Sequence, residues 1–387
     1  EDWEQRKLNE IADRVSEKNK NNEFSEPFTN SAEQGIISQR DYFDREIVNN
    51  ENLNGYYIVR NDDFIYNPRI SVTAPVGPIN RNRLGRNGVM SPLYTVFRTH
   101  DINNLYLEFY FKTTKWHRFM KLNGDSGARF DRFTISSTQF MEMPIPYPML
   151  DEQIKIGEYF DTLDHLITLH QHKCDEMKKM KKCMLQKMFP QNGKKVPEIR
   201  FEGFTNDWEQ RKLNEVAEFN PKSDLPESFE YVDLESVVGT EMVSHRTETK
   251  ETAPSRAQRL AQTGDVFFQT VRPYQRNNYL FTKPDNNYVF STGYAHMRPK
   301  IDAEFLMCFL QTDSFVKVVL DNCTGTSYPA INSNDLSNLE IYLPTSEDEQ
   351  RRIGCFITNL DYLITLHQHK CDELQNLKKY MLQNMFV

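Results

Sequence analysis

The chain carries the same scaffold twice. The segment from Asp2 to Ala12 returns as Asp207 to Ala217 with a single exchange of Ile for Val. A second block, Leu163 to Phe189, returns as Leu360 to Phe386 with 20 of 27 positions identical. Repeats of about 20 to 50 residues build solenoids, whereas a period of about 200 residues predicts two whole modules on one frame, related by a pseudo-two-fold axis.

The segments between the shared blocks, roughly 13–150 and 218–347, show no obvious similarity to each other. The frame is therefore duplicated and its contents are not, so the molecule presents two different surfaces in one fixed geometry. Short alternating runs and longer apolar segments predict a mixed α/β (α+β) fold for each module. The expected strands lie at 56–59, 64–66 and 265–268, and the expected helices lie at 105–120 and 303–320.

The second shared block predicts one long helix in each half. Acidic residues follow Pro148 and Pro344, which is typical of a helix start. Apolar positions then recur at alternating steps of four and three, which predicts a coiled-coil seam. The seam residues are Ile156, Phe160, Leu163, Ile167 and His170 in the first copy, and Ile353, Ile357, Leu360, Ile364 and His367 in the second. We expect these helices, each about 58 Å long at about 1.5 Å per residue, to pair antiparallel with the modules at opposite ends.

A histidine stands four residues before a cysteine in the middle of each seam, as His170 with Cys174 and His367 with Cys371. We interpret these histidines as polar core positions that fix the register of the helix pair. The alternative is a tetrahedral metal site of two histidines and two cysteines. The expectation is that no metal is bound.

Composition limits the class of protein. With 387 residues and 38% hydrophobic residues, the chain has enough material for two folded domains. No run of 18 apolar residues and no signal-like start occurs, so we expect no membrane contact and a cytoplasmic location. Residues 197–206 precede the second copy and have no counterpart before the first, so we expect the natural chain to start earlier. Six cysteines without a C-x-x-C pair predict reduced thiols.

The charge is unevenly distributed. The net charge is -8, yet Arg69 to Arg132 holds 11 Lys or Arg against 4 Asp or Glu, and Ser244 to Lys300 holds 9 against 4. Each module thus contains a basic region within an acidic molecule. This distribution predicts a localised site for a polyanion in each module.

The sequence lacks the motifs of the enzymes that act on DNA. An adenine methyltransferase needs an Asp/Asn-Pro-Pro-aromatic loop, and Asn67-Pro68-Arg69 lacks the second proline and the aromatic residue. No phosphate-binding loop, G-x-S-x-G or H-E-x-x-H sequence occurs. We therefore expect no catalytic residue and no cofactor bound by this chain.

Polar side chains in loops of the basic regions are the candidate DNA contacts. Arginine reads guanine and asparagine reads adenine in the major groove, and both also bind phosphate. In each module the candidates follow a strand and recur in a late turn near 123–132 or 324–328. They are Asn67, Arg69, Arg81, Asn82, Arg83, Arg86, Asn87, Ser126, Arg129 and Arg132 in the first module, and Arg256, Arg272, Tyr274, Arg276, Asn277, Thr326, Ser327 and Tyr328 in the second.

Three duplicated motifs and the repeated helices carry a resemblance. The motifs are Trp3-x-x-x-x-Leu8 with Trp208-x-x-x-x-Leu213, Asn61-Asp62-Asp63-Phe64 with Thr263-Gly264-Asp265-Val266, and the helix starts Gln153 to Gly157 with Gln350 to Gly354. Over essentially its whole length, the chain resembles the DNA-specificity subunit of type I restriction-modification systems.

The resemblance implies target-recognition domains at 1–150 and 207–347, spacer helices at 151–189 and 348–387, and a linker at 190–206. Each domain would read one half of an asymmetric, bipartite site in double-stranded DNA. It also implies two modification subunits, which hold the adenine methyltransferase site and S-adenosylmethionine, and restriction subunits, which use ATP and Mg and cut DNA. The base-reading residues of this family differ between members, so the candidates above rest on the local argument.

Two alternatives from other classes remain. A stand-alone DNA-binding regulator would bind a specific site without a partner. A coiled-coil adaptor protein would show no salt-dependent affinity for DNA.

Overall fold

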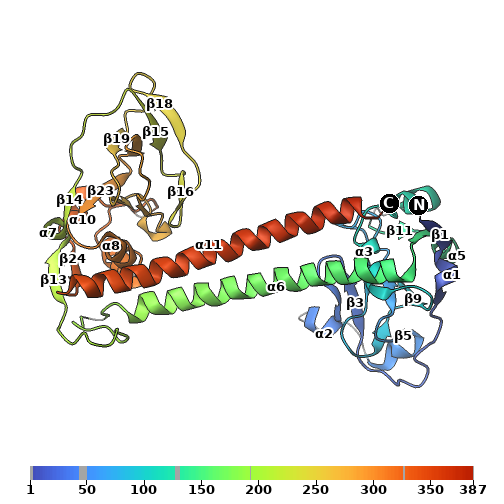
Figure 1. The fold of residues 1–387 in the computed structure, drawn as a ribbon. Coiled ribbons are helices and arrows are strands. Elements are labelled where there is room, and N and C mark those ends of the chain that lie inside the picture. The colour runs from blue at the N-terminus through green and yellow to red at the C-terminus, as the bar shows by residue number, and fades with distance from the viewer. Residues whose placement is uncertain (1–2, 43–49, 127–130, 192, 326, 387) are drawn as a thin grey trace. The chain divides into compact units, whose positions relative to one another are not determined.

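The computed structural model describes residues 3–42, 50–126, 131–191, 193–325 and 327–386. The chain folds into two compact units. Unit 1 comprises Glu1–His170 and His369–Val387, and unit 2 comprises Gln171–Gln368. Two long helices, α6 (Leu150–Lys187) and α11 (Glu347–Asn384), each contribute residues to both units (Figure 1). The helices expected at 151–189 and 348–387 are therefore present.

Unit 1 is built on an antiparallel sheet of order β2-β9-β6-β7. Its strands are β2 (Ala12–Arg14), β9 (Thr95–Thr99), β6 (Phe64–Tyr66) and β7 (Ile79–Arg81). Three further strand pairs are β3 (Phe28–Ser31) with β4 (Gly35–Ser38), β5 (Tyr57–Val59) with β8 (Gly88–Met90), and β10 (Asp125–Ser126) with β11 (Phe133–Thr134). The helices are α1 (Leu8–Ile11), α2 (Gln39–Tyr42), the 3-10 helix η1 (Asn50–Gly55), α3 (Asn104–Phe111), α4 (His117–Asn123) and α5 (Ser137–Met141).

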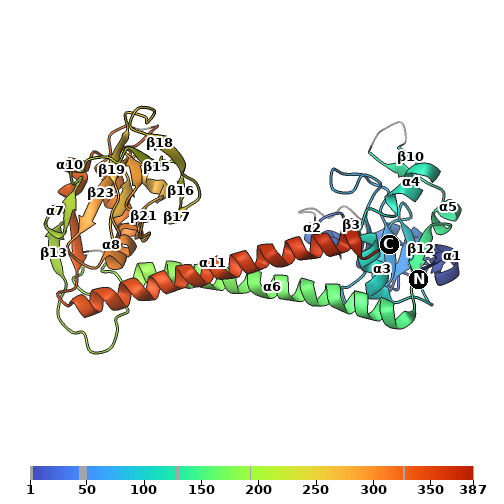
Figure 2. The same cartoon turned by 45° about the horizontal axis from the view of Figure 1, so that its top comes forward.

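Unit 2 contains a sheet of the same kind, of order β14-β23-β20-β21, and a second four-stranded sheet of order β18-β15-β22-β19. The first comprises β14 (Ala217–Phe219), β23 (Tyr294–Pro299), β20 (Val266–Gln269) and β21 (Tyr279–Leu280). The second comprises β18 (Arg246–Thr249), β15 (Ser228–Val232), β22 (Tyr288–Ser291) and β19 (Ala257–Leu260). The remaining elements are α7 (Leu213–Val216), β16 (Val237–Val238), β17 (Glu241–Met242), the 3-10 helix η2 (Pro273–Gln275), α8 (Ala303–Leu310), α9 (Asp313–Asp321) and α10 (Ser333–Ser337). In Figure 2 helix α8 lies beside the strands of the first sheet, with which it is in contact.

The first repeated block closes each module. Its Glu-Gln-Arg-Lys stretch forms β1 (Glu4–Lys7) in unit 1 and β13 (Glu209–Lys212) in unit 2. These strands pair antiparallel with the short strands just before the long helices, β12 (Pro144–Tyr147) and β24 (Glu340–Leu343). The repeated sequence therefore fastens the start of each module to the segment where its long helix begins.

The repeated helix start is explained by a tether and a close approach. Gln153 donates from Nε2 to the Pro148 carbonyl and accepts from the Asn103 amide, and Gln350 makes the same two bonds with Pro344 and Asp302. A Cβ added at Gly157 would lie 2.7 Å from the Leu105 Cβ. Glycine is thus required because α6 touches the first turn of α3.

The equivalent glycine of unit 2 is in the same position. A Cβ added at Gly354 would lie 2.7 Å from the backbone nitrogen of Phe305 in α8. Real Cβ atoms do not approach backbone atoms so closely, so α11 can pack this closely on α8 only with glycine at this turn. The Gln-x-x-Ile-Gly motif therefore fixes each long helix to its own module.

Within each unit the two long helices pair antiparallel, as expected. In unit 2 the Cys174 thiol lies 3.9 Å from the Ile364 carbonyl, and in unit 1 the Cys371 thiol lies 4.0 Å from that of Ile167. The seam residues Ile156, Phe160, Leu163, Ile353, Ile357 and Leu360 are buried. They also belong to the cores of the two units, so this part of the seam packs on a module as well as on the other helix.

The residues just after each long helix enter a module core. Phe386, just after α11, is fully buried in unit 1 and its ring lies 5.4 Å from that of Tyr106 and 5.9 Å from that of Phe160. Phe189, just after α6, is buried in unit 2 with its ring 5.6 Å from that of Phe305. Each module is completed by the helix that begins in the other half of the chain.

Helices are present at 105–120 and 303–320 as expected, but each stretch is divided into two short helices. Thr113 and Thr312 donate their hydroxyls to carbonyls of the preceding turn, and Thr312 also accepts from the Phe315 amide at the start of α9. Threonine side chains that bond to the local backbone end helices in this way.

Candidate DNA interface

The structure brings together two groups of candidates in unit 1. Arg69, in the loop between β6 and β7, and Arg132, in the late turn, form a backbone bridge although 63 positions separate them. The backbone amide of Ile70 donates to the backbone carbonyl of Asp131, and the backbone amide of Phe133 donates to that of Pro68. Both arginines are exposed. Two cations thus lie side by side on one edge of the module, without a carboxylate partner in the described part of the chain.

A polar cavity of about 510 Å³ lies next to Arg69. Asn67 lines it, with its Nδ2 held by the Asn30 carbonyl at 2.8 Å. Further polar groups in the lining come from Thr29, Asn30, Ser31, Glu33, Gln39, Tyr42, Ser71, Thr73 and Tyr94. These groups match the donors and acceptors on base edges. Sequence reasoning missed Thr29, Asn30 and Ser31 because strand β3 lies outside the basic region. Those within the region, such as Ser71 and Tyr94, are single hydroxyl groups that follow no recognisable pattern.

Unit 2 repeats this arrangement with different side chains. Val271 forms a backbone bridge with Ala330. Beside it, the amide of Arg272 donates to the Pro329 carbonyl, and the amide of Ile331 donates to the Thr270 carbonyl. The guanidinium of Arg272 lies 4.5 Å from the centre of the Tyr328 ring. The same backbone bridge therefore joins Arg69 and Arg132 in unit 1, but Val271 and Ala330 in unit 2, where Arg272 and Tyr328 lie beside the bridged residues.

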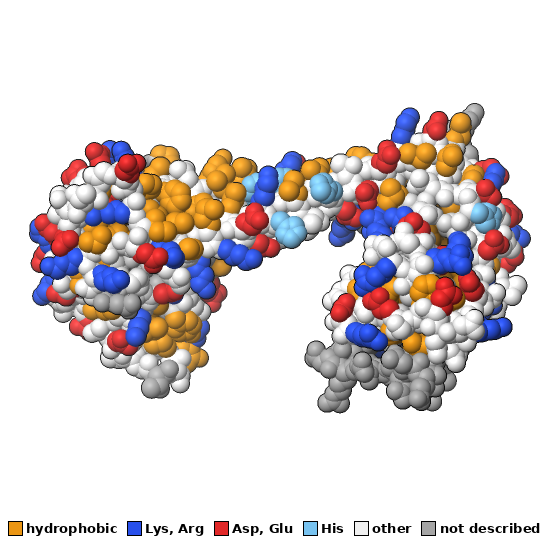
Figure 3. Space-filling model, turned by 90° about the horizontal axis from the view of Figure 1, so that it is seen from below, with side chains coloured by type: hydrophobic (Ala, Val, Ile, Leu, Met, Phe, Trp, Pro, Cys, Tyr) orange, Lys and Arg blue, Asp and Glu red, His pale blue; other side chains and the backbone are white. Residues whose placement is uncertain are grey.

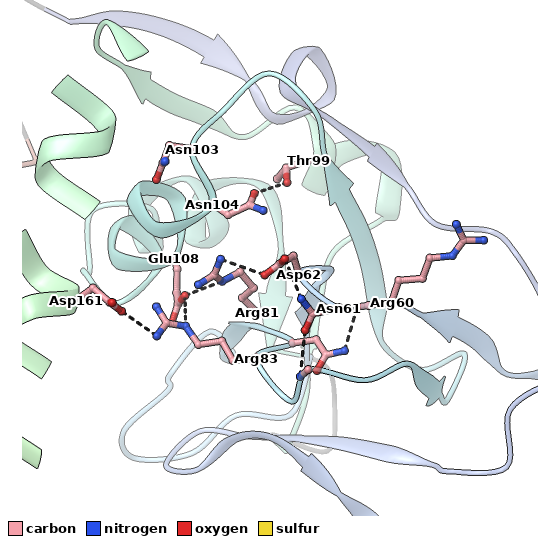
Figure 4. Close-up of polar contacts among 12 residues, drawn as sticks. Arg60, Asn61, Asp62, Arg81, Arg83, Thr99, Asn103, Asn104, Glu108 and Asp161 are labelled. Atoms are coloured by element: carbon pink, nitrogen blue, oxygen red, sulfur yellow. Dashed lines mark hydrogen bonds and ion pairs between the residues drawn. The ribbon is translucent and has the colours of Figure 1, made fainter. Parts of the chain in front are cut away.

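Some candidate arginines of unit 1 are occupied by internal carboxylates. Arg81 and Arg83 both bind Glu108, with Nε 2.8 Å from Oε2 in each case, and Arg83 also reaches Asp161 of α6 at 3.0 Å (Figure 4). Glu108 is 7% exposed, so the pair holds the β7–β8 loop to α3 and α6. Arg81, with 10% of its side chain exposed, is a structural residue, which corrects the expectation that it contacts DNA.

The rest of this loop is also ordered from within. Asn82 is fully buried and donates to the carbonyls of Arg60 and Arg86, which corrects the expectation of a DNA contact. Arg86 makes two bonds to Glu26, and these hold the pKa of Glu26 below its ordinary value. The side chain of Asn87 is exposed and accepts from the Asn61 amide, so it shapes the turn.

The second-module candidates divide in the same way. Arg276 donates to the Gln311 carbonyl and to the Asp313 carboxylate. The hydrogen bond to the carboxylate lowers the pKa of Asp313. Asn277 accepts from the Gly239 amide. Tyr274, with 49% of its surface exposed, and the exposed Arg256 and Ser327 stay available to a ligand. Arg129 and Thr326 lie outside the described residues, and Ser126 forms part of β10.

The duplicated turn before β6 and β20 supports the base of the interface. Asp62 and Gly264 hold positive φ angles of 69° and 93°. The next residue in each copy is a buried aspartate, and Arg98 binds Asp63 through two bonds while Arg298 binds Asp265. Burial acts to raise the pKa of Asp265, but hydrogen bonds from His296 and Arg298 outweigh it and lower that pKa.

The pattern of two modules with one frame and unlike loops agrees with a known family. The family model of the type I restriction modification DNA specificity domain matches residues 1–179 and 205–376. The chain belongs to this family. The two matched segments correspond to the two copies of the duplicated scaffold.

The chain is similar in sequence to a named specificity subunit and similar in fold to solved structures of specificity subunits. The type I restriction enzyme MjaVIII specificity subunit of Methanocaldococcus jannaschii is 23% identical over 320 residues, covering 77% of this chain and 73% of that protein. The S subunit of a type I restriction-modification system from M. genitalium has a TM-score of 0.60 with 13% identity, covering 100% of this chain and 96% of that chain. The HsdS subunit of Thermoanaerobacter tengcongensis has a TM-score of 0.50 with 16% identity, covering 99% and 96%.

The expected fold class is confirmed: two mixed α/β modules and two long helices, as in these specificity-subunit structures. On the face shown in Figure 3, Lys and Arg are scattered among Asp and Glu and do not form one continuous basic area. Among the residues that the structure describes, no group of three or more His, Cys, Asp or Glu is placed to hold a metal ion. Nor does any described helix have the length and apolar character needed to cross a membrane.

Proposed function

We propose that this chain is the DNA-specificity subunit of a type I restriction-modification complex, in which each module reads one half of an asymmetric, bipartite site in double-stranded DNA. The observation that carries the proposal is the backbone bridge found in both units. In one unit the bridged residues are Arg69 and Arg132, whereas in the other they are Val271 and Ala330, with Arg272 and Tyr328 beside them. One frame with two sets of side chains specifies two different base sequences.

The chain itself selects the site and performs no reaction. Methyl transfer to adenine and extrusion of the target base are assigned to two modification subunits that bind S-adenosylmethionine. ATP hydrolysis, with Mg, and DNA cleavage are assigned to restriction subunits. The complex works on cellular DNA, which places it in the cytoplasm.

The exposed side of the long helices supports docking of the modification subunits. In unit 2, α11 exposes Tyr362 (65%) and Leu366 (49%), and in unit 1 it exposes Leu377 and Tyr380 (62%). Aromatic residues in exposed positions are typical of protein interfaces. The two apolar positions recur in α6 as the exposed Leu169 and Met180, so the repeated helices present related apolar positions to two copies of one partner.

Base-specific binding by the assembled complex tests the proposal. Arg69→Ala with Arg132→Ala is expected to reduce discrimination at base pairs of one half-site only, by about 1–3 kcal/mol per lost base contact. Arg272→Ala with Tyr328→Ala is expected to affect the other half-site. Arg118→Ala, an exposed change on α4 outside the interface, is the control.

The alternatives give different results. Specific binding by the purified chain with no modification subunit would favour a stand-alone regulator. Absence of salt-dependent DNA affinity in the complex would favour the adaptor and contradict the proposal. Loss of discrimination at both half-sites from either double change would contradict the division of the site between the modules.

A further inference from the structure

A cavity of about 860 Å³ in unit 1 has four lysines among its eleven lining residues. Lys112 and Lys115 come from the α3–α4 segment, and Lys378 and Lys379 come from the last turns of α11. Asp164 of α6 is the one carboxylate among the lining residues. Four cations against one anion give this cavity a strongly positive lining.

Two of these lysines are held in place and two are free. Lys378 pairs with Asp164, and Lys112 lies 3.6 Å from Asp164, 3.4 Å from Glu108 and 4.5 Å from the centre of the Phe109 ring. Lys115 and Lys379 are exposed and have no carboxylate within 4 Å in the described part of the chain. The cavity therefore offers two ammonium groups to an external anion.

The equivalent place in unit 2 shows which part of this feature belongs to the common frame. There a cavity of about 600 Å³ is lined by Lys181 and Lys182, the counterparts of Lys378 and Lys379. Lys181 is paired with Asp361, just as Lys378 is paired with Asp164. Lys178 and Arg276 also line this cavity, and three acids, Glu241, Asp313 and Asp361, offset its four basic residues.

The two copies of the helix differ just before this lysine pair. Residues 178–180 read Lys-Lys-Met, whereas residues 375–377 read Gln-Asn-Leu, and the Lys-Lys pair follows in both. Lys379 belongs to the shared frame, whereas Lys115 belongs to the first module's own segment. Because the modules differ in the side chains at their base-reading edge, a contact from the frame is suited to the part of DNA that does not vary with sequence. That part is the phosphate backbone.

We propose that the lysine-lined cavity of unit 1 binds the phosphate backbone of the DNA whose half-site this unit reads. Lys115 and Lys379 make the phosphate contacts, while Lys112 and Lys378 are fixed by Asp164 and raise the local potential. The cavity contributes affinity without sequence preference. This inference rests on the proposed function.

The test is a salt titration of DNA binding by the full chain assembled with its modification subunit. Lys115→Ala with Lys379→Ala is compared with Lys121→Ala with Lys370→Ala, which removes the same charge from exposed positions of unit 1 outside the cavity. Each titration uses a duplex with the recognised motif and a scrambled duplex. Assembly with the modification subunit and thermal unfolding are measured for every variant.

The cavity variant is expected to bind both duplexes more weakly, by roughly threefold to tenfold per lysine, with unchanged preference between them. The slope of log affinity against log salt should fall by about 0.9 per contact, or about 2 in total, and the control should keep the wild-type slope.

Other outcomes overturn the inference in distinguishable ways. If the wild-type complex prefers its motif and the cavity variant keeps the wild-type slope, the cavity does not bind DNA and the proposed function stands. If the variant loses its modification subunit while its DNA slope is unchanged, the cavity receives an acidic protein surface instead. A wild-type complex without motif preference would remove the proposed function itself.

Discussion

Lys181 of α6 lies 2.5 Å from Asp361 of α11, measured from Nζ to Oδ1. The identical relationship occurs in unit 1 between Lys378 and Asp164, and in each case the lysine side chain is 19% exposed. The shared block therefore carries both halves of a reciprocal pair. Such pairs fix the register of the two helices because a slip of either helix would leave a partly buried charge without its partner.

A double-mutant cycle on Lys181→Met and Asp361→Leu measures this pair. We expect a coupling energy of about 1 kcal/mol in urea unfolding, since the pair is only partly screened by water. The matched control is Lys370 with Glu373, an exposed pair with side chains 46% and 69% exposed, for which the coupling should be close to zero. Equal coupling energies in the two cycles would contradict a register function.

The glycine contact between helix and module predicts a local packing defect. Gly157→Ala and Gly354→Ala each place a Cβ within 2.7 Å of α3 or α8, so the long helix must move away from its module. We expect a loss of about 1–3 kcal/mol in the free energy of unfolding, although alanine favours helices elsewhere. Glu158→Ala, an exposed change in the same turn, should have little effect. Stabilisation by either glycine substitution would show that the contact is not close.

The last described residue of the chain is predicted to stabilise the first module. Phe386→Ala removes a fully buried ring that packs on Tyr106 and Phe160, and the expected cost is about 3–5 kcal/mol. Hydrogen exchange should accelerate in α3 and in the first turns of α6, while the sheets of unit 2 stay protected. Phe189→Ala should give the reverse pattern, because its ring packs on Phe305 and Trp208. Equal loosening of both units by Phe386→Ala would contradict the reciprocal packing.

Acid sensitivity of unit 2 follows from Asp265. The pKa of this buried carboxyl is lower in the folded protein than its ordinary value of about 3.9. Its contribution is therefore fully present above about pH 4 and is lost as the pH falls through the folded-state pKa. Asp265→Asn should cost about 3–5 kcal/mol at pH 7 because it breaks a buried pair with Arg298 and His296.

The same substitution should flatten the dependence of unit 2 stability on pH between about 5 and 2. Urea unfolding of the wild type and the variant over this range measures the effect. Asp285→Asn, at an exposed position, is the control. An unchanged pH dependence in Asp265→Asn would show that this carboxyl does not govern acid unfolding.

The two long helices and their duplication could be predicted from sequence because regularly spaced apolar residues and a repeated block define them. The seam positions from Ile156 to Leu163 recur at helical spacing, and the copies confirm each other. The tertiary contacts of the seam were not predicted. The alternating spacing of apolar residues does not show that Phe160 packs on Phe109 of its own module as well as on Phe386. Periodicity identifies a buried face but not the partner that covers it.

The candidate site was predicted in part for a similar reason. Proximity to a strand end identified Arg69 and Arg272, which lie at the bridged edge of their units. An exposed arginine and an internally paired arginine look alike in sequence. The carboxylates that bind Arg81 and Arg86 are Glu108 and Glu26, and only the fold brings them within reach.

The most direct test of the account is a methylome of cells that express this chain with its modification subunit. Long-read sequencing should reveal N6-methyladenine in one bipartite, asymmetric motif that depends on the chain. Exchange of 13–150 for the corresponding segment of another family member should change one half of the motif, and exchange of 218–347 should change the other. A stable complex that methylates no motif, or one whose two halves change together, would contradict the account.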